Sequence, residues 1–132
     1  MQPEILFFLG RMIYSVMLIL LGANHFINLD YLTGYVKAQG VPFAGYMVVI
    51  SGVVLILGAL SILLGVLTLY GVLLLVLFFL PMTFVMHRFW VIADPALQMQ
   101  EMMQFTKNFV IMGAALMLLA IQNWSFALSA TG

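Results

Sequence analysis

The sequence predicts an all-α membrane protein, a bundle of four transmembrane helices with both termini on the same side of the membrane. The first observation is composition: 66% of the 132 residues are hydrophobic and only 6% are charged, whereas a soluble domain carries about 25% charged residues. The second is segmentation, because apolar residues gather near 5–26, 46–64, 66–86 and 107–123. Each segment is close to the ~20 residues that cross a bilayer. An even number of crossings returns the chain to its starting side, and residues 1–132 form a single domain.

Charge and cysteine content exclude several classes of function. The formal net charge is zero, so the chain lacks the basic surface with which proteins bind nucleic acid. It contains no cysteine, which excludes disulfides, thiolate ligation of iron–sulfur clusters and dithiol redox chemistry. The lipid bilayer is the partner that this composition predicts.

The first apolar segment, Ile5–Phe26, is interrupted by Arg11. Spacings of four and three place one stripe of residues on a single helix face: Arg11, Ser15, Leu18, Gly22 and His25. If this stripe faces inward, it keeps the charge out of lipid; in the alternative, the Arg11 side chain snorkels to the headgroups. A cleaved signal peptide is a rival interpretation of the segment, although apolar residues precede Arg11 and no A-x-A cleavage pattern follows.

A polar link separates the first span from the second. Within it, Tyr31–Ala38 is expected to form a short interfacial helix, since tyrosine sits well at headgroup depth. The second and third spans, Tyr46–Leu64 and Val66–Met86, are joined by a tight uncharged turn near Gly65. Small side chains share one face of the second span, which favours close helix packing: Ser51, Gly58, Ser61 and Gly65.

The fourth span, Lys107–Gln122, follows a second polar link, and Asn123-Trp124 is expected to end it at the interface. The segment Gln98–Lys107 within that link is expected to be helical. Of the ten acidic, basic and histidine side chains, five lie between residues 87 and 108: His87, Arg88, Asp94, Glu101 and Lys107. Such crowding in an apolar chain indicates either a water-facing cap or a site.

Six residues are candidates for ligand binding: Arg11, His25, His87, Arg88, Lys107 and Asn108. The histidines are candidate proton carriers or ligand donors, with metal or haem ligation, or simple contact with headgroups, as alternatives. Two histidines do not specify a metal site, and none is predicted. Arg88 is also a typical membrane-interface anchor. Lys107 and Asn108, placed at the start of the fourth helix, fit ligand contact and helix–helix contact equally.

The chain resembles the DoxX family of small four-helix bacterial and archaeal membrane proteins over roughly residues 5–122. The resemblance rests on these motifs: Gly10-Arg11, Gly40-Val41-Pro42, Gly58 with Leu63-Leu64-Gly65, His87-Arg88-Phe89-Trp90, and Gln104-Phe105-Thr106-Lys107-Asn108 before Gly113. The second helix departs from the family, in which an acidic residue is frequent there; here Val53, Val54 and Leu55 are apolar.

The resemblance implies a tie to membrane redox chemistry, since some relatives look like subunits of a thiosulfate:quinone oxidoreductase. One hypothesis is therefore a quinone-linked subunit of a redox complex in a bacterial or archaeal cytoplasmic membrane, with quinone as the cofactor and other membrane or redox subunits as partners. The other is a non-catalytic protein that binds lipid or a hydrophobic metabolite, or that assembles membrane complexes. A homo-oligomer fits either, and whether the chain is an enzyme stays open.

Overall fold

The computed structural model describes residues 2–128, and regular structure there is entirely helical. The elements are α1 (Pro3–Ile27), α2 (Leu29–Ala38), α3 (Ala44–Leu64), α4 (Thr68–Met86), the 3₁₀ turn η1 (Phe89–Val91) and α5 (Pro95–Leu118). Within residues 2–128, three segments are long and apolar enough to cross a membrane: α1, α3 and the segment that begins with α4. The predicted spans at 5–26, 46–64 and 66–86 thus match these helices closely, and α5 is not among the three.

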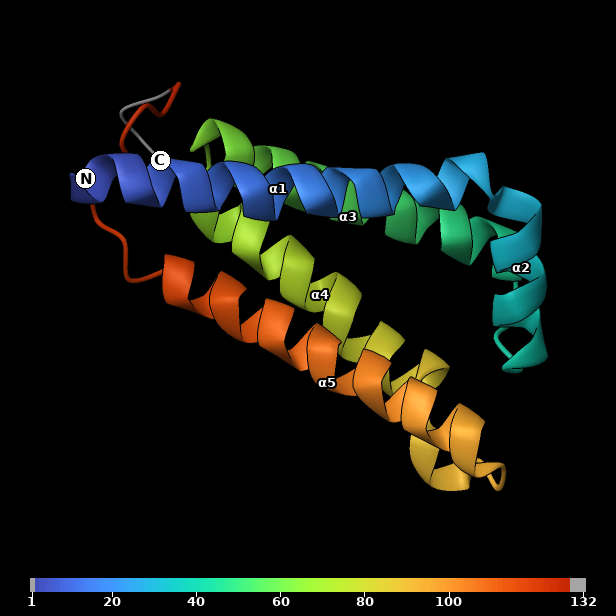
Figure 1. Ribbon diagram of the computed structural model, residues 1–132. Helices are drawn as coiled ribbons and strands as arrows, with labels where there is room; N and C mark the ends of the chain where they lie inside the picture. Colours follow the sequence, from blue (N-terminus) through green and yellow to red (C-terminus); the bar gives the residue numbers. More distant parts are fainter. Residues whose placement is uncertain (1, 129–132) are drawn as a thin grey trace.

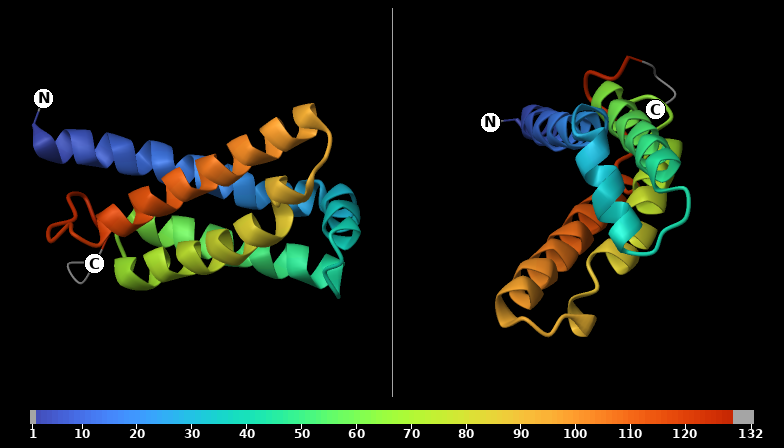
Figure 2. Two further views of the ribbon diagram at one scale, coloured as in Figure 1. Left: turned by 90° about the horizontal axis from the view of Figure 1, so that it is seen from below. Right: turned by 90° about the vertical axis from the view of Figure 1, so that its right-hand side faces the viewer.

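The long helices lie side by side, with α3 between α1 and α4, and with α5 packed against α4 (Figure 1). The short helix α2 lies across one end of the bundle, where it packs on α3. Helices α1 and α5 approach each other at the end where the chain begins and separate toward α2 (Figures 1 and 2). The end of the bundle near α2 is therefore the more open one.

The boundaries of α5 correct the expectation for the C-terminal part. The sequence predicted a helix at 98–107 and a separate span from Lys107, but one continuous helix runs from Pro95 to Leu118. Asp94 caps its N-terminus by accepting a hydrogen bond from the backbone N–H of Ala96 at 3.3 Å, and a proline follows at the first helical position, where its missing N–H costs nothing. The helix ends before Asn123, which lies outside it.

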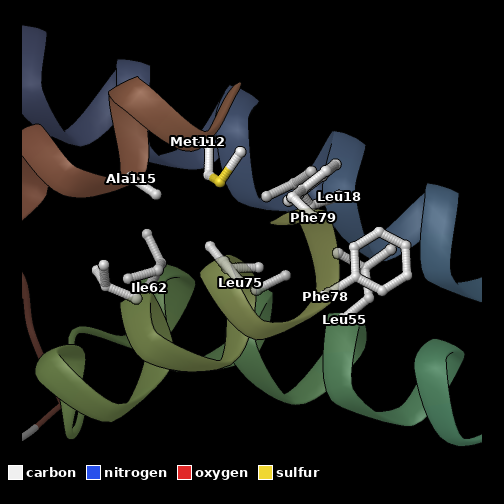
Figure 3. Packing of buried hydrophobic residues seen from close by; sticks show 10 residues of the cluster. Leu18, Leu55, Ile62, Leu75, Phe78, Phe79, Met112 and Ala115 are labelled. Atoms are coloured by element: carbon white, nitrogen blue, oxygen red, sulfur yellow. The ribbon is translucent and has the colours of Figure 1, made fainter. Parts of the chain in front are cut away.

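One hydrophobic core joins all four long helices (Figure 3). Its labelled members come from α1 (Leu18), α3 (Leu55, Ile62), α4 (Leu75, Phe78, Phe79) and α5 (Met112, Ala115). Lipid tails are as apolar as these side chains, so close packing rather than exclusion of water must hold the helices together.

Glycines allow the close approach that such packing needs. A Cβ on Gly58 would lie 2.9 Å from Leu75 Cδ2 and 3.1 Å from the Gly71 carbonyl oxygen, so α3 and α4 meet there without room for a side chain. Gly22 makes the matching contact between α1 and α3, since its Cβ would lie 3.3 Å from the Gly52 carbonyl oxygen. Gly65, with a φ of +68°, ends α3 and begins the tight turn into α4. The predicted small-residue face of the second span is confirmed as a packing face at Gly58.

Candidate functional site

The stripe predicted on the first helix faces inward. Arg11, Ser15, Leu18 and Gly22 are the buried residues of α1. Only 3% of the Arg11 surface is exposed, so this side chain is enclosed within the protein and does not extend to the headgroups. It lies in the N-terminal half of α1, and α2 follows the other end of that helix.

The other end of the bundle carries a chain of three polar side chains. His87 Nδ1 lies 2.5 Å from Glu101 Oε2, and the hydroxyl of Tyr35 donates to Glu101 Oε1 at 3.2 Å. Less than a fifth of either side chain of the His87–Glu101 pair is exposed, at 14% and 18%. Three elements supply the groups: Tyr35 comes from α2, His87 follows the last residue of α4, and Glu101 comes from the first half of α5. The Glu101 carboxylate thus contacts His87 through one oxygen and accepts the hydrogen bond of Tyr35 through the other.

Tyr35, the tyrosine of this polar group, keeps its hydroxyl proton. Burial, together with the negative charge of Glu101 and the hydrogen bond to it, raises the pKa of Tyr35 to about 12. A phenol with this pKa stays a hydrogen-bond donor throughout the neutral range. Tyr35 therefore fixes one oxygen of Glu101, while the other faces the imidazole of His87.

Aromatic side chains hold the loop between His87 and Glu101 against α5. Phe89 and Trp90, both in η1, contact Phe105 of α5 with ring centroids at 5.4 and 5.9 Å. The carboxamide of Gln98 donates to the Phe89 carbonyl oxygen at 3.3 Å. Because η1 is fixed in this way, His87 and Glu101, 14 residues apart in sequence, are brought into contact.

An open pocket of about 220 Å³ lies beside these groups. Polar and apolar side chains share its lining: Tyr35, Gln39, Arg88 and Glu101 with Met86, Val91, Ile92 and Leu97. Arg88 Nη2 donates to Gln39 Oε1 at 3.2 Å, while its buried Nε has no partner. Pockets that enclose a whole drug-sized ligand measure about 300–1,000 Å³. This pocket is smaller than that range.

Of the six predicted site residues, the structure brings together His87 and Arg88. His25 lies elsewhere, with its Nδ1 3.0 Å from the Leu21 carbonyl oxygen and its ring 5.6 Å from that of Phe78. Arg11 lies near the opposite end of the bundle.

Lys107 and Asn108 occupy different faces of α5. Lys107 is exposed and its Nζ lies 2.5 Å from Gln104 Oε1 on the same helix. It stands in the middle of α5, whereas the sequence predicted it at the start of the fourth helix. Asn108 is 4% exposed, and its amide contacts the sulfur of Met82 on α4 at 3.9 Å, which is a helix–helix contact.

Three residues that line the pocket were not among the six candidates predicted from the sequence: Tyr35, Gln39 and Glu101. The sequence placed Glu101 among the crowded polar residues without making it a site candidate, and it predicted only a short interfacial helix in the first link. A useful signal was the placement of Tyr35 and Gln39 four residues apart, which puts both on one face of a short helix.

These features define a small helical membrane protein with a hydrogen-bonded acid–histidine–tyrosine group at one end of its bundle. The family model of DoxX matches residues 6–88, and the chain belongs to this family. The match covers α1 to α4 and His87, while α5 and its Glu101 lie beyond it. No curated protein and no solved structure matches the chain.

Proposed function

We propose that this protein is a quinone-binding membrane subunit of a redox complex in a bacterial or archaeal cytoplasmic membrane. The observation that carries the proposal is the Tyr35–Glu101–His87 chain beside a pocket that also contains the Arg88 guanidinium. The apolar part of the lining suits a quinone ring, and the polar part suits its carbonyl oxygens. Membership of the DoxX family supports the assignment to a membrane.

The chemistry required is proton transfer coupled to reduction of the ring. A quinone takes up two electrons and two protons to become a quinol. The partly buried pair of His87 and Glu101 is suited to deliver protons, because an imidazole and a carboxylate in direct contact form a short path for proton transfer. Arg88 is positioned to stabilise the negative charge that develops on the ring oxygen. The electrons would come from a redox centre on a partner subunit.

We infer further that α5 completes a four-helix transmembrane bundle with both ends of the chain on one side of the membrane. Its 24 residues span about 36 Å at 1.5 Å per residue. Its second half supplies Met112 and Ala115 to the common core. Trp124, beyond its end, packs on Phe7 near the start of α1 with ring centroids at 5.3 Å.

The test is quinone binding by full-length protein. An organic extract of the purified protein, compared by mass spectrometry with a mock purification, should contain near-stoichiometric quinone. Titration with a short-tailed quinone, followed by tryptophan fluorescence, should give binding that Glu101→Gln weakens about tenfold or more, the factor expected for loss of a hydrogen bond to a charged group. The matched change Lys107→Gln lies outside the pocket and should leave binding unchanged.

Two outcomes would count against this function. Equal quinone binding by wild type and Glu101→Gln would remove the polar chain from the site. A stoichiometric phospholipid in place of quinone would instead identify a non-catalytic lipid-binding protein, because the same headgroup pocket would then hold a ligand without redox chemistry.

A further inference from the structure

The surroundings of Arg11 are unusual for a charged side chain. Its guanidinium lies 5.4 to 5.7 Å from the ring centroids of Phe7, Phe8 and Trp124. One nitrogen, Nη2, donates to the Phe126 carbonyl oxygen at 3.3 Å, and the buried Nε and Nη1 have no hydrogen-bond partner. A cation that can donate five hydrogen bonds is thus enclosed with a single acceptor.

No carboxylate neutralises this charge within residues 2–128. The ion pair found in that part of the chain is His87–Glu101, at the other end of the bundle. Cation–π contact with the aromatic rings offsets only part of the cost of burying this charge. A buried charge without a counter-ion remains unfavourable, so an anion bound at this position would stabilise the protein.

A second unpartnered donor lies one turn further along α1. Ser15 is fully buried, and its Oγ has no hydrogen-bond partner. It stands four residues after Arg11, which places both residues on the same face of α1, about 6 Å apart along the helix. The buried face of α1 therefore carries unpartnered donors at both positions.

The carbonyl that accepts from Arg11 belongs to a segment that is weakly attached. We call residues 121–128 the C-terminal strap; they follow α5 without regular helix. Phe126 has a φ of +57°, a left-handed conformation that is unfavourable for a residue other than glycine. Its bond to Arg11, at 3.3 Å, exceeds the usual 2.7–3.2 Å range. The backbone N–H of Leu128 donates to the Leu64 carbonyl oxygen at 2.9 Å, which ties the strap to the end of α3.

We propose that Arg11 binds the phosphate group of an anionic membrane lipid, whose oxygens replace the Phe126 carbonyl when the strap moves aside. A phosphodiester offers two charged oxygens, which match the paired donors of a guanidinium. The lipid is favoured over a free anion because α1 is one of the candidate membrane spans, which brings its ends near the headgroups of a bilayer. This site is separate from the pocket at Glu101 and does not depend on its function.

The first experiment measures lipid selectivity. Full-length protein in detergent is mixed with equal amounts of phosphatidylglycerol and phosphatidylcholine of identical acyl chains, and the retained lipids are counted by native mass spectrometry. Wild type should prefer phosphatidylglycerol, and Arg11→Met should reduce that preference about tenfold or more, as expected when hydrogen bonds to a charged group are lost. Lys37→Gln removes one exposed positive charge from α2 and should keep the preference. A preference that survives in Arg11→Met overturns the proposal.

The second experiment keeps the arginine and releases the strap. Leu128→Pro removes the N–H that bonds Leu64, whereas Leu128→Ala retains it. Retention of phosphatidylglycerol should rise in Leu128→Pro and stay at the wild-type level in Leu128→Ala; an unchanged or lower value in Leu128→Pro overturns the proposal. Inorganic phosphate is added in a separate arm. If phosphate binds in an Arg11-dependent manner and phosphatidylglycerol does not, the ligand is a free anion and the assignment to lipid is wrong.

Discussion

The hydroxyl of Tyr35 and the carboxylate of Glu101 are joined by a hydrogen bond of 3.2 Å although 66 residues separate them. The bond links α2, which caps the bundle, to the first half of α5. It crosses the more open end of the molecule, where α1 and α5 are apart (Figure 1). Together with the contact from Arg88 to Gln39 at 3.2 Å, it connects both polar links around the pocket.

Removing this bond should lower stability measurably. We expect Tyr35→Phe to reduce the free energy of unfolding by about 0.5–1.5 kcal/mol, the net worth of one intramolecular hydrogen bond. Thermal unfolding in detergent, followed by tryptophan fluorescence, measures the change. Tyr31→Phe is the matched control, because Tyr31 on the same helix is 75% exposed. Identical unfolding temperatures for the two variants would show that the Tyr35–Glu101 bond adds nothing.

The ionisation of Tyr35 gives a pH dependence with a defined sign. Its pKa is raised from about 10 to about 12, so the folded state favours the neutral phenol. The resulting stability is fully present below pH 10 and is lost as the pH rises through 12. The difference in absorbance at 295 nm between wild type and Tyr35→Phe should therefore titrate near pH 12. A difference that titrates near pH 10 would place the hydroxyl in water.

The His87–Glu101 pair should contribute more than a surface ion pair. Both side chains are less than a fifth exposed, so solvent screens the contact only in part, and Glu101→Gln is expected to cost about 1–2 kcal/mol. Asp30→Asn removes an exposed carboxylate from α2 and should cost less than about 0.5 kcal/mol. Thermal unfolding of both variants at neutral pH tests this order. Equal losses would mean that the pair is no stronger than a surface contact.

Alanine at two glycines should change stability in opposite directions. At Gly58 a Cβ would meet Leu75 at 2.9 Å and the backbone of Gly71 at 3.1 Å, so we expect Gly58→Ala to cost about 1–3 kcal/mol through overpacking. At Gly34 in α2 a Cβ has no neighbour within 4 Å, and alanine there should gain about 0.5–1 kcal/mol from helix propensity. Unfolding temperatures of the two variants give the comparison. A neutral Gly58→Ala would show that α3 and α4 can separate without loss.

Local periodicity predicted most of the helices and one feature of the interior. The spacing of Arg11, Ser15, Leu18 and Gly22 depends only on the geometry of a single helix, and these are the residues that α1 buries. The first three spans were predictable for the same reason, since length and hydropathy are properties of one segment.

The pairing of His87 with Glu101 could not be predicted in this way. It depends on where η1 turns the chain and on where Asp94 starts α5, because both decide which face of α5 meets the end of α4. The start of the last helix was predicted at Lys107 instead of Pro95 for a related reason. Polar residues at 98–107 were interpreted as a link between helices, although they continue directly into the apolar half of α5.

The continuity of α5 has a mechanical consequence. Glu101 and Met112 stand on one uninterrupted helix, so they move as parts of a single rigid rod. Met112 is packed in the common core, and the carboxylate at the pocket is thereby kept in a fixed position relative to that core. Any rotation or sliding of α5 that repacks Met112 also displaces Glu101 from His87. The contact between His87 and Glu101 therefore depends on the position of α5 in the bundle.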